Sequence, residues 1–135
     1  MQREWQVGPH RAHIEEPDVL IVQLNGPTDL EHARGLVEVY QEVGTRQPMF
    51  AVLKVKGSPV DAAARKYFSQ HLRSEWYHAI IFVGAGMVER AMGKAMTVAL
   101  YFAGRWTAEF LYADTEEQAR ELIAQVRAKK AARKG

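Results

Sequence analysis

Five histidines are the residues best suited to binding a metal ion or transferring a proton. His10 and His13 lie on a predicted strand, where an offset of three residues places them on opposite faces. His71 and His78 lie at the two ends of a predicted helix–turn–strand unit, and no spacing resembles the H-E-x-x-H pattern of a zinc site. We therefore expect no metal site, and histidines at exposed or half-buried positions.

A serine nucleophile and a phosphate-binding loop are the other chemistries that the sequence offers. Ser58 lacks the G-x-S-x-G context of an activated nucleophile, and no base lies near it in the sequence. Gly84, Ala85 and Gly86 lie between a predicted strand and a predicted helix, a geometry that can hold a phosphate. A dinucleotide fingerprint requires a third glycine where this chain has Glu89, whose carboxylate would repel a pyrophosphate. We therefore expect a tight turn here, no catalytic residue, no cofactor and no enzymatic activity.

Basic residues gather on the polar side of a predicted helix that begins at Asp61. Arg65 and Arg73 are about two helical turns apart and so share one side, with Lys66 beside them. A basic helix face can bind an acidic partner surface, although a solvated face that binds nothing explains the same pattern. The predicted partner-binding residues of this helix and the loop before it are Gly57, Ser58, Asp61, Arg65, Lys66 and Arg73.

Bulky apolar residues gather around the next predicted helix, residues 87–102. Met92 and Met96 lie on this helix, Phe102 ends it, and Trp106 follows it. Methionine-rich helices can line adaptable pockets, which would suit an apolar, lipid-like ligand. Ordinary core packing accounts for the same residues, and a chain of 135 residues is short for a wide lipid cavity.

Length and composition limit the class of protein. With 135 residues, 47% of them hydrophobic, the chain can form one domain with a sizeable core. It has no cysteine, which fits a reducing cytosol, and no apolar run that resembles a signal peptide or a transmembrane helix. We therefore expect a cytoplasmic protein without a transmembrane segment.

Charge is unevenly distributed along the chain. Five of the 18 basic residues, and no acidic residue, lie within residues 127–135. The rest of the chain carries 13 basic against 16 acidic side chains, a net charge of −3. A mildly acidic body argues against a broad nucleic-acid-binding face, so we expect no specific nucleic-acid partner. The basic end is interpreted as a frayed helix end or tail, although it could also contact anionic lipid.

Alternating strands and helices must position all of these residues. Apolar, β-branched runs predict five strands, at residues 10–14, 19–24, 50–55, 79–83 and 107–112. A capping box of Thr28 with Glu31 opens the first helix, Asp61 caps the second, and Asp114 or Thr115 opens the last. The order β-β-α-β-α-β-α-β-α predicts an α/β fold with a mixed, mostly parallel five-stranded sheet and about four helices. Only the N-terminal strand is expected to be antiparallel to its neighbour.

Four short strings stand out along this order of elements: PDVLIVQLNGPTD, AAARKYF, IIFVGAGMVERAM and FLYADTEEQARELI. Together with the order of elements, they resemble the STAS domain family (sulfate transporter and anti-sigma-factor antagonist). The likeness is closest to its SpoIIAA-like branch, which is grouped with CRAL-TRIO lipid-carrier folds. The resemblance spans nearly the whole chain. It implies one STAS-like domain over residues 1–126, followed by the basic helix end or tail of residues 127–135.

The resemblance also implies a function without catalysis. It indicates a protein-interaction module of a bacterial regulatory or signalling pathway, in which the second helix and the loop before it face the partner. Members of the family carry a phosphorylatable serine after an aspartate at the start of this helix. Here Asp61 matches the aspartate, but Ala62, Ala63 and Ala64 follow it and have no hydroxyl, so we expect no serine phosphoswitch. A homodimer is compatible with this role. The alternative is a small carrier or sensor of an apolar ligand, using Met92, Met96, Phe102 and Trp106.

Overall fold

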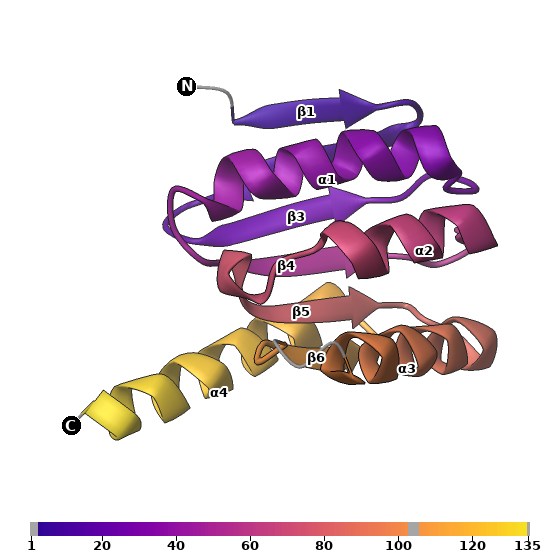
Figure 1. The fold of residues 1–135 in the computed structure, drawn as a ribbon. Coiled ribbons are helices and arrows are strands. Elements are labelled where there is room, and N and C mark those ends of the chain that lie inside the picture. The colour runs from indigo at the N-terminus through magenta and orange to yellow at the C-terminus, as the bar shows by residue number, and fades with distance from the viewer. Residues whose placement is uncertain (1–2, 103–105, 135) are drawn as a thin grey trace.

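The computed structural model describes residues 3–102 and 106–134 (Figure 1). Within these residues, six strands form one sheet in which the spatial order of the strands is their order along the chain. They are β1 (Glu4–Val7), β2 (His10–Glu15), β3 (Val19–Gln23), β4 (Met49–Lys54), β5 (Tyr77–Val83) and β6 (Glu109–Ala113). The pairs β1–β2 and β2–β3 are antiparallel, whereas β3, β4, β5 and β6 are parallel to one another.

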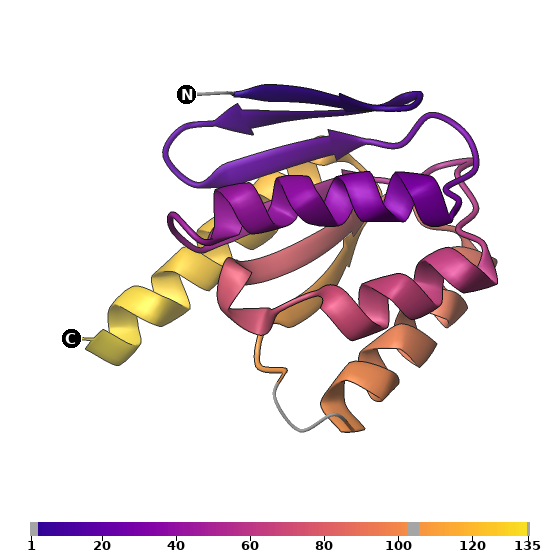
Figure 2. The ribbon, with the colours of Figure 1, turned by 45° about the horizontal axis from the view of Figure 1, so that its top comes forward.

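Helices cover both faces of the sheet (Figures 1 and 2). The described helices are α1 (Leu30–Gly44), α2 (Ala62–His71), α3 (Met87–Phe102) and α4 (Glu116–Lys134), with a short 3-10 turn, η1 (Ser74–Trp76), before β5. When successive right-handed crossovers all advance in the same direction across a parallel sheet, their helices lie on the same face of that sheet. Since the strand order never reverses, α1, α2 and α3 lie together on one face and α4 lies on the other.

The core has two apolar layers, one on each face of the sheet. The first layer lies between α1 and the sheet. It includes Leu20, Leu36 and Ile80, each of which is at most 3% exposed. Against α4, Ile81 and Ile123 belong to the second layer. Neighbouring residues of the central strands alternate between the two layers, so both kinds of position are apolar, as in a parallel sheet that is covered on both faces.

The α/β class and the mixed sheet are confirmed, but the predicted number of strands is wrong. The structure adds β1, in which Trp5 and Val7 pack on the α1 side while Glu4 and Gln6 are exposed. Four alternating residues are too short a signal to distinguish from an irregular terminus. Because β1 pairs with β2, two strand pairs are antiparallel, and the prediction of only one is also wrong.

The last strand begins later than predicted because a buried serine holds the preceding residues. The hydroxyl oxygen of Ser74 accepts the backbone N–H groups of Thr107 at 2.8 Å and Ala108 at 2.9 Å. These two N–H groups are therefore satisfied by a side chain, and strand pairing starts at Glu109.

Local polar contacts fix the helix ends. Asp61 caps α2 as predicted, and its carboxylate accepts the N–H of Ala64 at 2.8 Å. The predicted cap of α1 at Thr28 is wrong by one residue, because Asp29 occupies this position and its carboxylate accepts the N–H of His32 at 2.9 Å. For α4, the Thr115 hydroxyl accepts the N–H of Gln118 at 3.1 Å.

The fourth helix crosses the second face and continues to Lys134. Ala119, Ile123 and Val126 form its buried side, and beyond them the helix extends past the sheet (Figure 1). The Arg127 guanidinium donates to the Asp18 carboxylate and lies 5.2 Å from the centre of the Phe50 ring. Among the described residues, no helix is both long and apolar enough to span a membrane.

Candidate interaction surface

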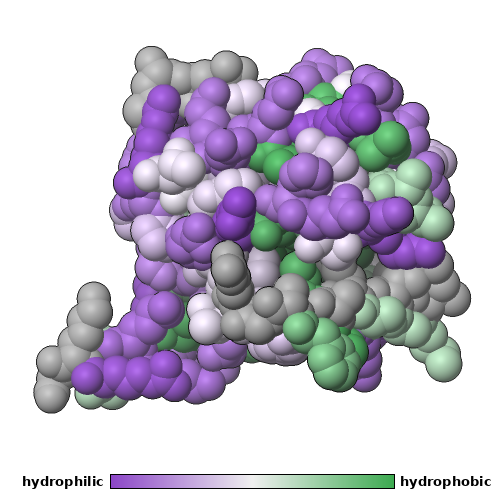
Figure 3. All heavy atoms as spheres, viewed as in Figure 1, coloured by the Kyte–Doolittle hydropathy of each residue, from purple (hydrophilic) through white to green (hydrophobic). Residues whose placement is uncertain are grey.

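One side of α3 exposes an apolar stripe along its whole length. Met87, Val98 and Phe102 are 90%, 52% and 88% exposed, and Ala91 and Ala95 between them are also exposed. Their spacing of three or four residues places all five on one side of the helix. We call these five residues the apolar stripe. Figure 3 shows apolar surface over α3 at the lower right of this face, below a mainly hydrophilic surface over α1.

The side of α3 opposite the apolar stripe packs against the rest of the protein. Gly93 and Leu100 are buried, and a Cβ atom at Gly93 would lie 2.6 Å from the hydroxyl oxygen of Tyr112. The Arg90 guanidinium donates to the carbonyl of Ala85 at 3.1 Å and to Asp114 at 3.3 Å. These contacts attach α3 to β6 and to the turns at the ends of β5 and β6, so the stripe faces away from the sheet.

The charged side chains that the structure describes on α2 and α3 are basic. Lys66 on α2 and Lys94 on α3 are exposed, α2 contains no acidic residue, and the side chain of Glu89 on α3 lies outside the described residues. Asp61 precedes α2 and is engaged as its cap, and Asp114 is paired with Arg90. In its described part, the surface formed by α2 and α3 therefore combines the apolar stripe with basic charge beside it.

Ser58, in the loop before α2, has a buried side chain. The Ser58 side chain is 2% exposed, and its hydroxyl donates to the carbonyl of Leu24 at 2.8 Å and accepts the N–H of Gly26 at 3.3 Å. Ser58 therefore holds the loop after β3 against the loop after β4. Gly57 is exposed and has a φ of 69°, a left-handed conformation that favours glycine.

The predicted basic side of the second helix is only partly present. Arg65 donates to the carbonyl of Val60 at 2.7 Å, and Lys66 is exposed. The premise that Arg73 shares their helix is wrong, since α2 ends at His71 and Leu72 is extended with a ψ of 142°. Arg73 instead precedes η1, in an extended conformation.

Of the four residues predicted to bind an apolar ligand, the structure describes the side chains of Phe102 and Trp106. Trp106 is 7% exposed and packs with Tyr77 and Phe110, and its indole N–H donates to the carbonyl of Ala108. Phe102 lies on the exposed stripe, and the side chains of Met92 and Met96 lie outside the described residues. An apolar cavity of about 50 Å³ exists elsewhere, under α2, and a space of this size holds a water molecule but no lipid chain. Its lining is Tyr40, Ala51, Leu53, Phe68, Leu72, Tyr77, Ile80, Phe82 and Phe110.

A buried polar cluster lies where β3 and β4 end, and the sequence did not predict it. His10 is fully buried, against our expectation for the histidines. Its Nδ1 accepts the N–H of Asn25 at 3.0 Å, and its Nε2 lies 3.1 Å from the Thr28 hydroxyl. Burial, and then the nearby His32 imidazole, lower the pKa of His10 below its ordinary value. The spacing of two residues between His10 and Ala12 places both on the same face of the strand, which was the available signal for burial of His10. The sequence gives no signal for the groups that form hydrogen bonds with its imidazole.

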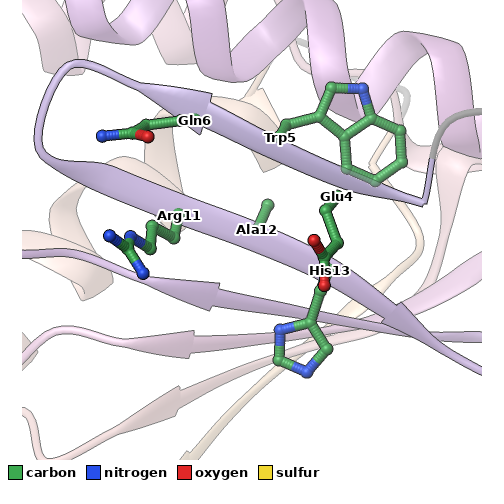
Figure 4. Close-up of a pocket in the computed structure, with 6 residues that line it drawn as sticks. All are labelled: Glu4, Trp5, Gln6, Arg11, Ala12 and His13. Carbon is green, nitrogen blue, oxygen red and sulfur yellow. The ribbon is translucent and has the colours of Figure 1, made fainter.

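A polar hollow of about 520 Å³ lies on the face of β1 and β2 that is turned away from α1 (Figure 4). Glu4 lies opposite His13, and Gln6 lies opposite Arg11, across the antiparallel pair. His10 and His13 thus occupy opposite faces, as predicted. Within the described part of the chain, no group of three or more acidic or histidine side chains is placed to hold a metal ion.

No protein-family model matches this sequence, and no curated protein matches it significantly.

Proposed function

We propose that this protein is a non-catalytic protein-interaction domain that binds its partner on the surface formed by α2 and α3. The apolar stripe supports the proposal most strongly. Single exposed apolar residues are ordinary, but five in register along a 16-residue helix form a continuous strip. Burying a large apolar side chain fully is worth about 1.5–3 kcal/mol, so covering the stripe would provide much of the free energy of binding.

The proposal includes a regulatory or signalling role in the bacterial cytoplasm, which rests on the STAS-like resemblance alone. It excludes control by phosphorylation at the second helix. Ala62, Ala63 and Ala64 have no hydroxyl, and the hydroxyl of Ser58 is buried and hydrogen-bonded. A kinase would have to open the loop before it could reach Ser58.

Replacing two residues of the stripe tests the proposal. Val98→Glu combined with Phe102→Glu adds two charges to the stripe without touching Gly93 or Leu100 on the buried side. The bait protein and this variant are used to capture proteins from a lysate of the source organism, followed by quantitative mass spectrometry. We expect the proteins enriched by the wild type to be lost with the variant.

A matched control separates the stripe from a general effect of charge. Gln41→Glu with Gln125→Glu adds the same two charges at exposed positions of α1 and α4. This control should capture the same proteins as the wild type, and circular dichroism should show that all three proteins are folded. An identical set of captured proteins for the wild type and the stripe variant would refute the proposal. Native mass spectrometry of the purified protein would then test the apolar-carrier alternative through any ligand that remains bound.

A further inference from the structure

We infer that the partner segment on the apolar stripe is an amphipathic helix with acidic residues beside its apolar side, and is neither a second copy of this chain nor a lipid surface. The inference rests on the proposed function, because it names what binds to that same surface. Its three supports are the shape of the stripe, the charge beside it and the position of Lys94.

The side chains of the apolar stripe are small at its centre and large at both ends. Ala91 and Ala95 occupy its centre, Met87 lies at one end, and Val98 and Phe102 lie at the other. From residue 87 to residue 102 it is about 22 Å long, at 1.5 Å per residue. Small residues at the centre allow another helix to approach closely, while the larger ends pack against its sides. A flat lipid surface would contact the bulky ends but leave the alanines uncovered.

Charge determines which helices suit this shape. Lys94 lies beside the centre of the stripe, and Lys66 lies on the neighbouring α2. The described acidic groups nearby, Asp61 and Asp114, are engaged by the N–H of Ala64 and by Arg90. Glutamate or aspartate beside the apolar side of a partner helix would therefore be attracted, whereas lysine or arginine would be repelled.

The position of Lys94 disfavours a second copy of the chain. It lies at the middle of α3, since the helix runs from Met87 to Phe102. A symmetric dimer that pairs the two stripes antiparallel would bring Lys94 close to its own copy. Like charges at the centre of an interface oppose binding, so this surface suits a different chain.

A display selection tests the inference without knowledge of the natural partner. The probe is a library of amphipathic helical peptides of about 18 residues, with a fixed leucine stripe and random residues beside it. Selection is run on the wild type, on Lys94→Glu, and on Lys129→Glu, which makes the same change of charge at an exposed position of α4. We expect peptides selected on the wild type and on Lys129→Glu to be enriched in Asp and Glu, and those selected on Lys94→Glu to lose this enrichment. Selected acidic peptides should bind Lys94→Glu roughly tenfold more weakly than the wild type at low salt.

Four results would overturn the inference. Two concern the selection, which would yield either peptides without a charge preference or no binder. The third is a wild-type dimer, seen in sedimentation, that Ala95→Glu dissociates. The fourth is sedimentation of the protein with phosphatidylserine vesicles in the absence of peptide binding. None of these results alters the outcome of lysate capture with the Val98 and Phe102 variant. The proposed function can therefore survive a failure of this inference, and the two failures are distinguishable.

Discussion

At the scale of single residues, the buried imidazole of His10 is held in its neutral form. Nδ1 accepts the N–H of Asn25, so it carries no proton, and Nε2 must then be the protonated nitrogen that donates to Thr28. Protonation of Nδ1 would remove the hydrogen bond from Asn25 and place a charge beside His32, whose ring centre is 4.9 Å away. The backbone carbonyl of Pro27, and then the carboxylate of Asp29 near His32, raise the pKa of His10 and partly oppose this effect.

This arrangement predicts a loss of stability in mild acid. Because the pKa of His10 is lowered in the folded protein, the unfolded chain takes up a proton first, at about pH 6.5. Stability is therefore complete above pH 6.5 and falls as the pH drops from there towards the folded pKa, by at most about 1.4 kcal/mol per pH unit. Urea denaturation at pH 7.5 and 5.5 measures the loss. His10→Gln should reduce this pH dependence, whereas His13→Gln, on the exposed face of the same strand, should retain it. Equal pH dependence in the wild type and His10→Gln would contradict the assignment.

A second residue-scale feature is the buried hydroxyl of Tyr112, which makes no hydrogen bond to a described residue. Burial raises the pKa of Tyr112, and Arg90 partly opposes this effect. A buried hydroxyl without a partner costs stability, so Tyr112→Phe should leave the free energy of unfolding unchanged or raise it.

The same hydroxyl explains why residue 93 is glycine. A Cβ atom there would lie 2.6 Å from the Tyr112 hydroxyl oxygen but 3.6 Å from the ring carbon that bears it. Gly93→Ala should therefore cost about 1–3 kcal/mol in the wild type and much less in Tyr112→Phe. A double-mutant cycle by chemical denaturation measures this coupling. Additive effects of the two substitutions would show that the hydroxyl does not set the cost.

At the scale of elements, periodicity predicted what depends on burial and missed what depends on single contacts. The wholly apolar run of β5 and the helical spacing of α1 are set by apolar faces, and both elements occur as predicted. The end of α2 after His71 and the start of β6 at Glu109 depend on an extended Leu72 and on the hydroxyl of Ser74. Neither contact has a periodic signal. The placement of Arg73 on the second helix is wrong for this reason, because it assumed that the helix continued past His71.

Three-dimensional packing determines which side of the third helix is exposed. Helical spacing showed that α3 was apolar on several sides but could not show which side was buried. Gly93, a residue without a side chain, forms part of the buried side, and Met87 and Phe102 are exposed. An apolar stripe normally predicts burial, so the sequence alone favoured a core role for residues that the structure places on the surface.

The attachment of α4 to the sheet predicts a second, more acidic loss of stability. Arg120 donates to Glu15 at 2.7 and 2.9 Å and to Glu116 at 3.0 Å. The hydrogen bonds from Arg120 lower the pKa of Glu15, and those from Lys54 and then Arg120 lower the pKa of Glu116. Because both folded pKa values are depressed, this stability is present above about pH 4.5 and is lost as the pH falls further.

Replacing Arg120 tests this attachment. Arg120→Gln should lower the free energy of unfolding by up to about 1 kcal/mol at pH 7, since the pairs are partly exposed. The difference from the wild type should shrink at pH 3, because both carboxyl groups take up protons as the pH falls below about 4.5. Denaturant titrations at the two pH values measure it, with Arg133→Gln on the exposed end of the same helix as the control. A difference that persists unchanged in acid would mean that Arg120 acts through packing.

At the scale of the whole molecule, basic charge is carried away from the folded body. α4 leaves the second face of the sheet after Val126, and the described residues beyond Arg127 belong to a helix without a buried apolar side. Arg127 is still attached to the body, because it donates to Asp18 and lies over Phe50. The boundary between the body and its projecting end therefore falls immediately after Arg127.

Two truncations test this boundary. Removing residues 128–135 deletes four basic residues and changes the formal net charge from +2 to −2. Because this segment covers no apolar core, the free energy of unfolding should stay within about 0.5 kcal/mol of the wild-type value, while retention on a cation-exchange column should fall sharply. Removing residue 127 as well deletes the contacts with Asp18 and Phe50, and should lower the free energy of unfolding by up to about 1 kcal/mol more. Thermal and denaturant unfolding of the wild type and both truncations measure the difference. A large loss in the shorter deletion would show that the projecting helix end packs against the body or against a second subunit, and the charge it carries would then have a structural role.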